Sequence, residues 1–237
     1  MGPAETKASL RDLSVRALAG RVDPIGGAHR YDAAVAATLR QAAVLLLFTL
    51  AGGRGQDAAG QDAAGPDGLP DLFLVQRSRA LRNHPGEIAL PGGSLDAGED
   101  AVSAALRENH EEIGLAARHV EVLGELPPML APFSGFVVTP VLGWTDAPGE
   151  ADEVEPGEVL HTLRVSVGSL VDPRVRHTVT FADRSSIGFL LPEGLVWGMT
   201  ANLLDHVLTG LGWAREWDRG RTVPIRRDDG GVWVPDI

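Results

Sequence analysis

The stretch from Gly93 to Leu115, GSLDAGEDAVSAALRENHEEIGL, is the part of the sequence that is most informative about the fold. We expect a helix over about residues 99–113, because apolar residues recur there at helical spacing. At 100° per residue, one narrow stripe of this helix is expected to face the core. Its members are Val102, Leu106, Asn109 and Ile113.

A different face of the same helix carries Glu108, Glu111 and Glu112. Like charges four residues apart destabilise a helix by a few tenths of a kcal/mol, so another interaction must compensate for the repulsion between these carboxylates. A solvated acidic face is the ordinary explanation for a Glu-rich helix. A divalent cation is the other explanation, since hard oxygen ligands are those that Mg²⁺ and Mn²⁺ prefer.

The surroundings favour the cation, because the segment resembles the Nudix box, G-x(5)-E-x(7)-R-E-U-x-E-E-x-G-U, where U is aliphatic. Seven specified residues coincide, which common residue frequencies would produce by chance about once in 10⁸ positions. Asn109 departs from the pattern, which has an aliphatic residue there, and this bears on packing more than on chemistry. The coinciding residues are Gly93, Glu99, Arg107, Glu108, Glu111, Glu112 and Gly114, followed by the aliphatic Leu115.

The resemblance implies an α/β fold, the Nudix α/β/α sandwich with a mixed sheet, and a cofactor, Mg²⁺ or Mn²⁺. Carried onto this sequence, it makes Glu108, Glu112, Glu111 and Gly93 the metal ligands. Arg107 would hold the carboxylates in position. A carboxylate would act as the general base that deprotonates the attacking water. Glu108 and Glu111 are candidates, and Glu158 or the acidic run 150–155 would supply a base from a later loop.

The segment upstream of the box, LVQRSRALRNHPGEIALPGG (74–93), gathers three arginines and a histidine in a chain of formal charge −11. A surface turn with solvated arginines is one reading. The residue order instead resembles the coenzyme A diphosphatase branch of the family, as do LVDP (170–173) and VWGMTA (196–201). The coinciding residues upstream are Arg77, Ser78, Leu81, Arg82, His84, Gly86, Glu87, Pro91, Gly92 and Gly93.

This second resemblance implies hydrolysis of coenzyme A, and of acyl-CoA, to 3′,5′-ADP and 4′-phosphopantetheine. Arg77 and Arg82 would bind phosphate, which arginine contacts in a bidentate manner. His84 would lie on the substrate side. A Gly92–Gly93 turn would let backbone groups approach the metal and the diphosphate closely, where a Cβ would obstruct them.

The 237 residues predict one domain with extensions. We expect an N-terminal helical extension (1–35), a catalytic domain (36–212) with a flexible insertion at 52–70, and a C-terminal extension (213–237). Strands and helices do not alternate regularly, which favours a mixed sheet. The first helix, about 7–19, is expected to turn Leu10, Leu13 and Leu18 inward.

Composition narrows the function further. The absence of cysteine excludes disulfides, cysteine-bound zinc and a thiol nucleophile. The net negative charge predicts no nucleic-acid partner, and the short apolar runs and absence of a targeting signal predict a cytoplasmic protein without a membrane contact. The expected partner is a small molecule, and a homodimer is compatible with the sequence.

Two alternatives remain at this stage. The same metal chemistry would serve ADP-ribose, NADH or another nucleoside diphosphate derivative, and only the upstream segment separates these substrates from coenzyme A. The other alternative is a non-catalytic nucleotide sensor with the same fold. Proteins of that kind usually lose carboxylates of the box, whereas Glu99, Glu108, Glu111 and Glu112 are all present here.

Overall fold

The computed structural model describes residues 2–50, 68–81, 83–151, 157–181, 184–229 and 231–236. Its helices are α1 (Pro3–Leu18), α2 (Ala33–Ala36), α3 (Ala101–Ile113), α4 (Val167–Leu170) and α5 (Gly198–Gly210), with 3-10 turns at Gly27–His29, Ala117–His119 and Pro148–Glu150. The strands of the larger sheet are β1 (Arg40–Thr49), β2 (Asp71–Arg77), β3 (Ile88–Ala89), β4 (Gly92–Ser94), β5 (Glu121–Glu125), β6 (Met129–Ala131), β7 (Phe136–Thr145) and β8 (Val159–Ser166). The strands of the smaller sheet are β9 (Arg176–Phe181), β10 (Arg184–Leu191), β11 (Gly194–Trp197), β12 (Thr222–Arg227) and β13 (Trp233–Pro235).

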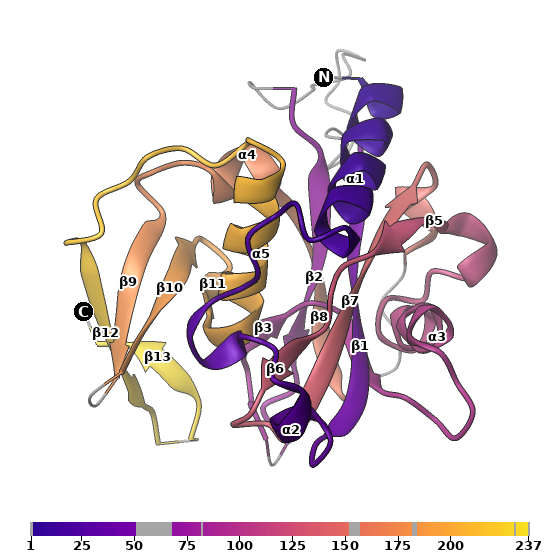
Figure 1. Ribbon diagram of the computed structural model, residues 1–237. Coiled ribbons are helices and arrows are strands. Elements are labelled where there is room, and N and C mark those ends of the chain that lie inside the picture. Colours follow the sequence, from indigo (N-terminus) through magenta and orange to yellow (C-terminus); the bar gives the residue numbers. More distant parts are fainter. Residues whose placement is uncertain are drawn as a thin grey trace.

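The larger sheet is mixed and runs β3-β2-β1-β7-β5, with β4 paired to β1, β6 to β7 and β8 to β2. β1 pairs in parallel with β7 from Arg40–Phe136 to Thr49–Thr145, and the other pairings are antiparallel. Helices lie on both faces, α3 on one and α1 and α5 on the other (Figure 1). The predicted α/β/α arrangement with a mixed sheet is therefore confirmed.

β1 explains why this arrangement forms. Successive side chains of a strand point to opposite faces of the sheet, so a strand covered on both sides must be apolar throughout. Ala43, Leu45 and Leu47 pack in the cluster with Ala104, Ala105 and Ile113 of α3. The alternate residues Val44, Leu46 and Phe48 pack in the cluster that contains Leu10 of α1 and Leu204 of α5.

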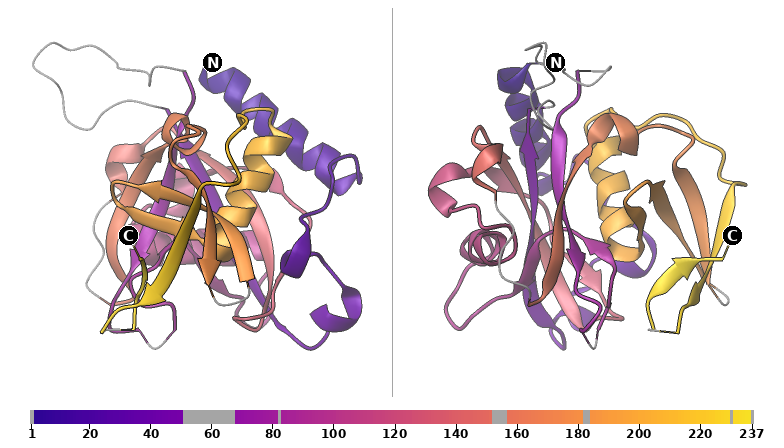
Figure 2. Two further views of the ribbon diagram at one scale, coloured as in Figure 1. Left: turned by 90° about the vertical axis from the view of Figure 1, so that its left-hand side faces the viewer. Right: turned by 180° about the vertical axis from the view of Figure 1, so that it is seen from behind.

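The smaller sheet, in the order β11-β10-β9-β12-β13, lies beyond α5 from the larger one (Figures 1 and 2). Ile187, Phe189 and Val196 pack in the same cluster as α5. The C-terminal residues complete this sheet, because β12 pairs in parallel with β9, from Thr222–Thr178 to Pro224–Thr180. No helix among the described residues has the length and apolar character that a bilayer crossing requires.

Three details differ from the sequence-based expectations. Gly92 and Gly93 form no turn but belong to β4, where they pair with Val44 and Ala43 of β1. Leu18 does not face the core: it is 62% exposed at the end of α1, whereas Leu10 and Leu13 are buried as expected. The predicted insertion at 52–70 lies outside the described residues except for 68–70.

Candidate active site

α3 begins and ends where its sequence directs. The Asp100 carboxylate accepts a hydrogen bond from the Ser103 backbone N–H at 2.7 Å and so caps the first turn. Gly114 ends the helix in the left-handed conformation at φ 79°, and its N–H donates to the His110 carbonyl. Both ends are thereby fixed, which fixes the positions of the carboxylates between them.

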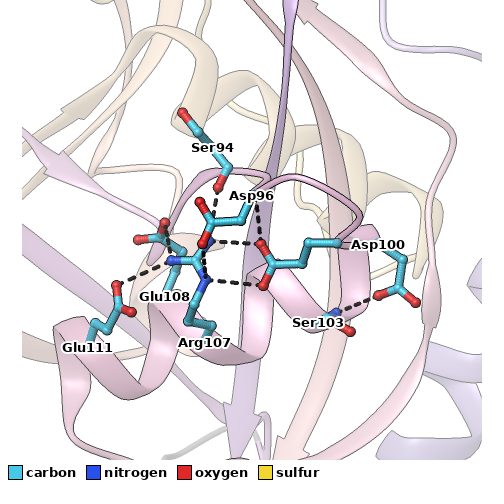
Figure 3. Close-up of polar contacts among 8 residues, drawn as sticks. Ser94, Asp96, Asp100, Ser103, Arg107, Glu108 and Glu111 are labelled. Carbon is cyan, nitrogen blue, oxygen red and sulfur yellow. Dashed lines mark hydrogen bonds and ion pairs between the residues drawn. The ribbon is translucent and has the colours of Figure 1, made fainter.

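Arg107 holds the acidic side chains of α3 together. Its Nη1 donates to Glu108 Oε1 at 2.8 Å and to Glu111 Oε2 at 3.3 Å (Figure 3). Its Nε and Nη2 donate to the two oxygens of Glu99 at 3.1 and 3.0 Å. Nη2 also donates to the Ser94 carbonyl at 2.9 Å, which ties the guanidinium to β4.

Glu112 is buried, although the helical wheel predicted that it would lie away from the core-facing stripe. Its side chain is 5% exposed, and its Oε2 accepts a hydrogen bond from the Gly92 N–H at 2.9 Å. Burial raises the pKa of Glu112 to about 7, more than the Gly92 hydrogen bond lowers it. This prediction was wrong because the small side chains of Ala104 and Ala105 allow the face of α3 that carries Glu112 to pack closely against the sheet.

Burial also raises the pKa of Glu108, and the negative charges of Glu111 and Glu158 add to this effect. The positive charge and hydrogen bond of Arg107 oppose it. Glu158 raises the pKa of Glu112 as well, so the later-loop carboxylate acts electrostatically on both helix carboxylates. Several carboxylates thus share a region that disfavours negative charge unless a cation is present.

Gly92 and Gly93 permit the close packing around these carboxylates. A Cβ on Gly93 would stand 2.3 Å from Glu108 Oε1, so the space in front of that carboxylate exists only because residue 93 has no side chain. A Cβ on Gly92 would stand 2.3 Å from the Ala43 carbonyl oxygen, and the φ of Gly92 is +154°. Glycine is therefore required at both positions, for a side-chain contact at one and a backbone contact at the other.

The donor chemistry of this region fits a hard divalent cation. Glu108 and Glu112 offer desolvated carboxylate oxygens, and the bare backbone of Gly93 lies against one of them. Within the described parts of the chain, no three acidic or histidine side chains already surround a single point. The Arg107 and Gly92 N–H groups occupy these carboxylates instead, with Glu111 57% exposed at the rim.

Arg77 lies at the end of β2, where the register with β8 shifts and Arg77 pairs with Val159. The Ser78 N–H donates to the Glu158 carbonyl at 2.7 Å, so Arg77 and Glu158 belong to neighbouring stretches of backbone. The positive charge of Arg77 lowers the pKa of Glu112. Its Nε is buried without a hydrogen-bond acceptor among the described residues, so a donor in this region lacks a partner.

His84 follows at φ 54°, an unusual conformation for a residue other than glycine. Its Nδ1 bonds to Glu87 Oε2 at 3.0 Å, which raises its pKa, and its Nε2 bonds to Ser134 Oγ at 3.1 Å. The Ser134 contact was not predicted, because fifty residues separate the two side chains in the sequence. Arg82 and the run 152–156 lie outside the described residues.

Several known proteins are similar to this chain. Residues 63–179 match the family model described as NUDIX domain. A protein described as uncharacterized Nudix hydrolase NudL, from Enterobacter sp. (strain 638), is 34% identical over 154 residues, 60% of this chain and 76% of the relative. Nudix hydrolase 3 of Caenorhabditis elegans is 30% identical over 162 residues, 60% of this chain and 68% of the relative. The crystal structure of a Nudix hydrolase from M. smegmatis, RenU, is similar at a TM-score of 0.45 and 21% identity, over 72% of this chain and 84% of that one.

Proposed function

Because this chain belongs to the Nudix hydrolase family and is a hydrolase of pyrophosphate bonds in nucleoside diphosphate derivatives, we propose that its substrate is coenzyme A. The products would be 3′,5′-ADP and 4′-phosphopantetheine, and acyl-CoA would be accepted as well. The observation that carries the proposal is the position of Arg77. Arg77 is half-buried, its Nε has no hydrogen-bond acceptor among the described residues, and its positive charge acts on the desolvated Glu112, so a substrate phosphate would supply a compensating anion.

Nudix hydrolases generally use a divalent cation such as Mg²⁺ or Mn²⁺, and we propose that Glu108, Glu112, Glu111 and the backbone of Gly93 would hold it in this chain. When bound, the ion neutralises diphosphate charge and lowers the pKa of a coordinated water. The raised pKa values of Glu108 and Glu112 support this assignment, since both carboxylates lie where a nearby cation would be favourable.

The protein's own residues would then position the reactants. Arg107 keeps Glu99, Glu108 and Glu111 in register with β4, and removal of such a supporting contact typically costs 10- to 100-fold in metal affinity or activity. Glu108, Glu111 and Glu158 remain the candidates for the general base. Arg77 and Arg82 would bind substrate phosphate, and His84 would lie on the substrate side.

The deciding experiment is a substrate panel. The purified protein, with Mg²⁺ or Mn²⁺, would be incubated with coenzyme A, ADP-ribose, NADH and diadenosine polyphosphates, and products identified by mass. Release of 3′,5′-ADP and phosphopantetheine is expected, with loss in Glu108→Gln and Glu112→Gln. Glu5→Gln is the matched control, because Glu5 makes the same charge change in the first turn of α1.

Other outcomes are equally informative. Cleavage of ADP-ribose or NADH without cleavage of coenzyme A would retain the metal site and reject the substrate. A folded protein that binds Mn²⁺ and nucleotide but cleaves none of the panel would instead support the non-catalytic sensor.

A further inference from the structure

The C-terminal hairpin formed by β12 and β13 contacts Arg79 and Gly86, which belong to the proposed substrate-binding segment. Val232, in the loop between the two strands, is 4% exposed. Its Cγ1 lies 2.9 Å from where a Cβ on Gly86 would stand, and Gly86 has a φ of +69°. Arg79 Nη1 lies 3.8 Å from Asp228 Oδ2. An apolar contact and an ion pair therefore join this hairpin to Gly86 and Arg79.

The hairpin loop is held by its own hydrogen bonds. The N–H of Asp228 donates to the Val232 carbonyl at 2.8 Å, and the N–H of Val232 donates to Asp228 Oδ1 at 2.8 Å. The N–H of Gly231 donates to the Asp228 carbonyl at 2.9 Å. The last residue before this loop, Arg227, consequently has a defined position relative to the substrate-binding segment.

An aromatic cluster supports the side chain of Arg227. Its guanidinium carbon lies 5.0 Å from the ring centroid of Trp233, within range of a cation–π interaction. Trp233 in turn packs edge-on against Trp197 at 5.7 Å and Phe181 at 6.1 Å. Arg227 Nη1 also donates to the Gly231 carbonyl at 3.3 Å. Trp233, which is held by the other two rings, limits the side-chain freedom of Arg227, so less conformational entropy is lost when this arginine binds a ligand.

The positive charges of Arg77 and Arg227 both act on the ring of His84, so both arginines lie within electrostatic range of that residue. No carboxylate among the described residues forms an ion pair with Arg227, which is exposed. Its neighbour Arg226 differs, because Arg226 Nε pairs with Asp236 Oδ1 at 3.0 Å.

We propose that Arg227 is a specificity-determining residue that binds a phosphate monoester of the substrate, separate from the diphosphate that is cleaved. The identity of that group rests on the proposed function, under which it is the 3′-phosphate of coenzyme A. The metal and Arg77 would engage the diphosphate, and Arg227 would engage the monoester. Guanidinium is suited to this contact because it can donate two parallel hydrogen bonds to phosphate.

The test is a binding measurement that requires no catalysis. Calorimetry in Mg²⁺ would compare 3′,5′-ADP with 5′-AMP, which differ only in the 3′-phosphate and contain no diphosphate bond to cleave. Wild type is expected to bind 3′,5′-ADP more tightly, and Arg227→Gln to lose about 10- to 100-fold of that affinity with little change for 5′-AMP. Arg226→Gln is the matched control, because alternation along β12 turns its side chain to the other face of the sheet.

A kinetic comparison separates this inference from the proposed function. Arg227→Gln is expected to raise KM for coenzyme A and to leave dephospho-coenzyme A nearly unaffected. If wild type cleaves neither compound, the proposed substrate is wrong, and the binding comparison still decides the role of Arg227. Equal affinity of wild type for 3′,5′-ADP and 5′-AMP, or equal losses in Arg227→Gln and Arg226→Gln, would overturn the inference.

Discussion

The backbone N–H of Gly92 donates a 2.9 Å hydrogen bond to the buried carboxylate of Glu112, which joins strand β4 to helix α3 at the centre of the site. One N–H does not replace the hydration that Glu112 loses, and its pKa stays raised, at about 7. The raised pKa of Glu112 makes the stability of the metal-free protein depend on pH.

The metal-free protein should lose stability as the pH rises from about 4.5 to about 7. Across this window the unfolded chain has already released the Glu112 proton, whereas the folded protein still holds it, so the folded state is increasingly disfavoured. A loss of about 1–3 kcal/mol is expected, or roughly 3–10 °C in Tm. Thermal unfolding in EDTA at pH 5 and pH 8 measures it.

Glu112→Gln should show a smaller fall between the two pH values, because the glutamine does not titrate. Excess Mg²⁺ should reduce the fall in wild type. Identical pH profiles for wild type and Glu112→Gln would mean that other groups cause the instability.

Gly93→Ala should remove activity while the protein stays folded. The added methyl would meet the Glu108 carboxylate, the far end of a flexible side chain that can rotate away. Displacement of this proposed metal ligand should lower kcat/KM by about 100-fold, with a stability change below about 1 kcal/mol. Gly26→Ala is the control, since no heavy atom lies within 4 Å of a Cβ at that position. Retained activity in Gly93→Ala would remove Glu108 from the metal site.

Gly92→Ala should instead destabilise the fold. Its methyl would lie 2.3 Å from the Ala43 carbonyl oxygen and 2.7 Å from Val44 Cα, which are backbone atoms of the central strand. We expect a loss of about 2–4 kcal/mol, because β4 must move away from β1 and the φ of +154° is unfavourable for alanine. Urea unfolding of the two adjacent glycine variants gives the comparison, and equal midpoints would contradict it.

Asn109→Leu should stabilise the protein by about 1 kcal/mol. Asn109 is fully buried, its Nδ2 donates to the Leu115 carbonyl at 3.1 Å, and its Oδ1 has no partner among the described residues. A leucine, which branches at Cγ as asparagine does, would remove the unpaired oxygen, although the Leu115 carbonyl would lose its donor. Asn109→Ala should have the opposite sign because it leaves a cavity. Thermal unfolding of both variants tests the prediction, and it is contradicted if Asn109→Leu lowers the Tm.

The sequence predicts this site unevenly. The ends of α3 and the Glu99–Arg107 pair follow from local signals: a capping carboxylate, a terminal glycine and spacing along one helix. The burial of Glu112 does not follow, because it depends on how closely the sheet approaches. Nor does the strand at Gly92–Ser94, since three residues carry no periodic pattern and are held there by pairing with β1.

The same limit applies to the smaller sheet. β12 and β13 are short, and β12 becomes a strand by pairing with β9, more than forty residues earlier in the chain. The contact between His84 and Ser134 likewise joins two segments that no local pattern relates. Helix caps and apolar periodicity are properties of neighbours in sequence, whereas these contacts are properties of the assembled fold.

The parallel pairing of β1 with β7 also affects how the chain folds during its synthesis on the ribosome. Each residue of β1 pairs with a residue 96 positions later in the chain, from Arg40 with Phe136 to Thr49 with Thr145. The apolar strand β1 is thus synthesised long before β7. Pairings between residues far apart in sequence form slowly, and until they form the unpaired strand edge is prone to aggregation. We therefore expect nascent chains that end before residue 136 to depend on chaperones, and chains that include β7 to be released from them.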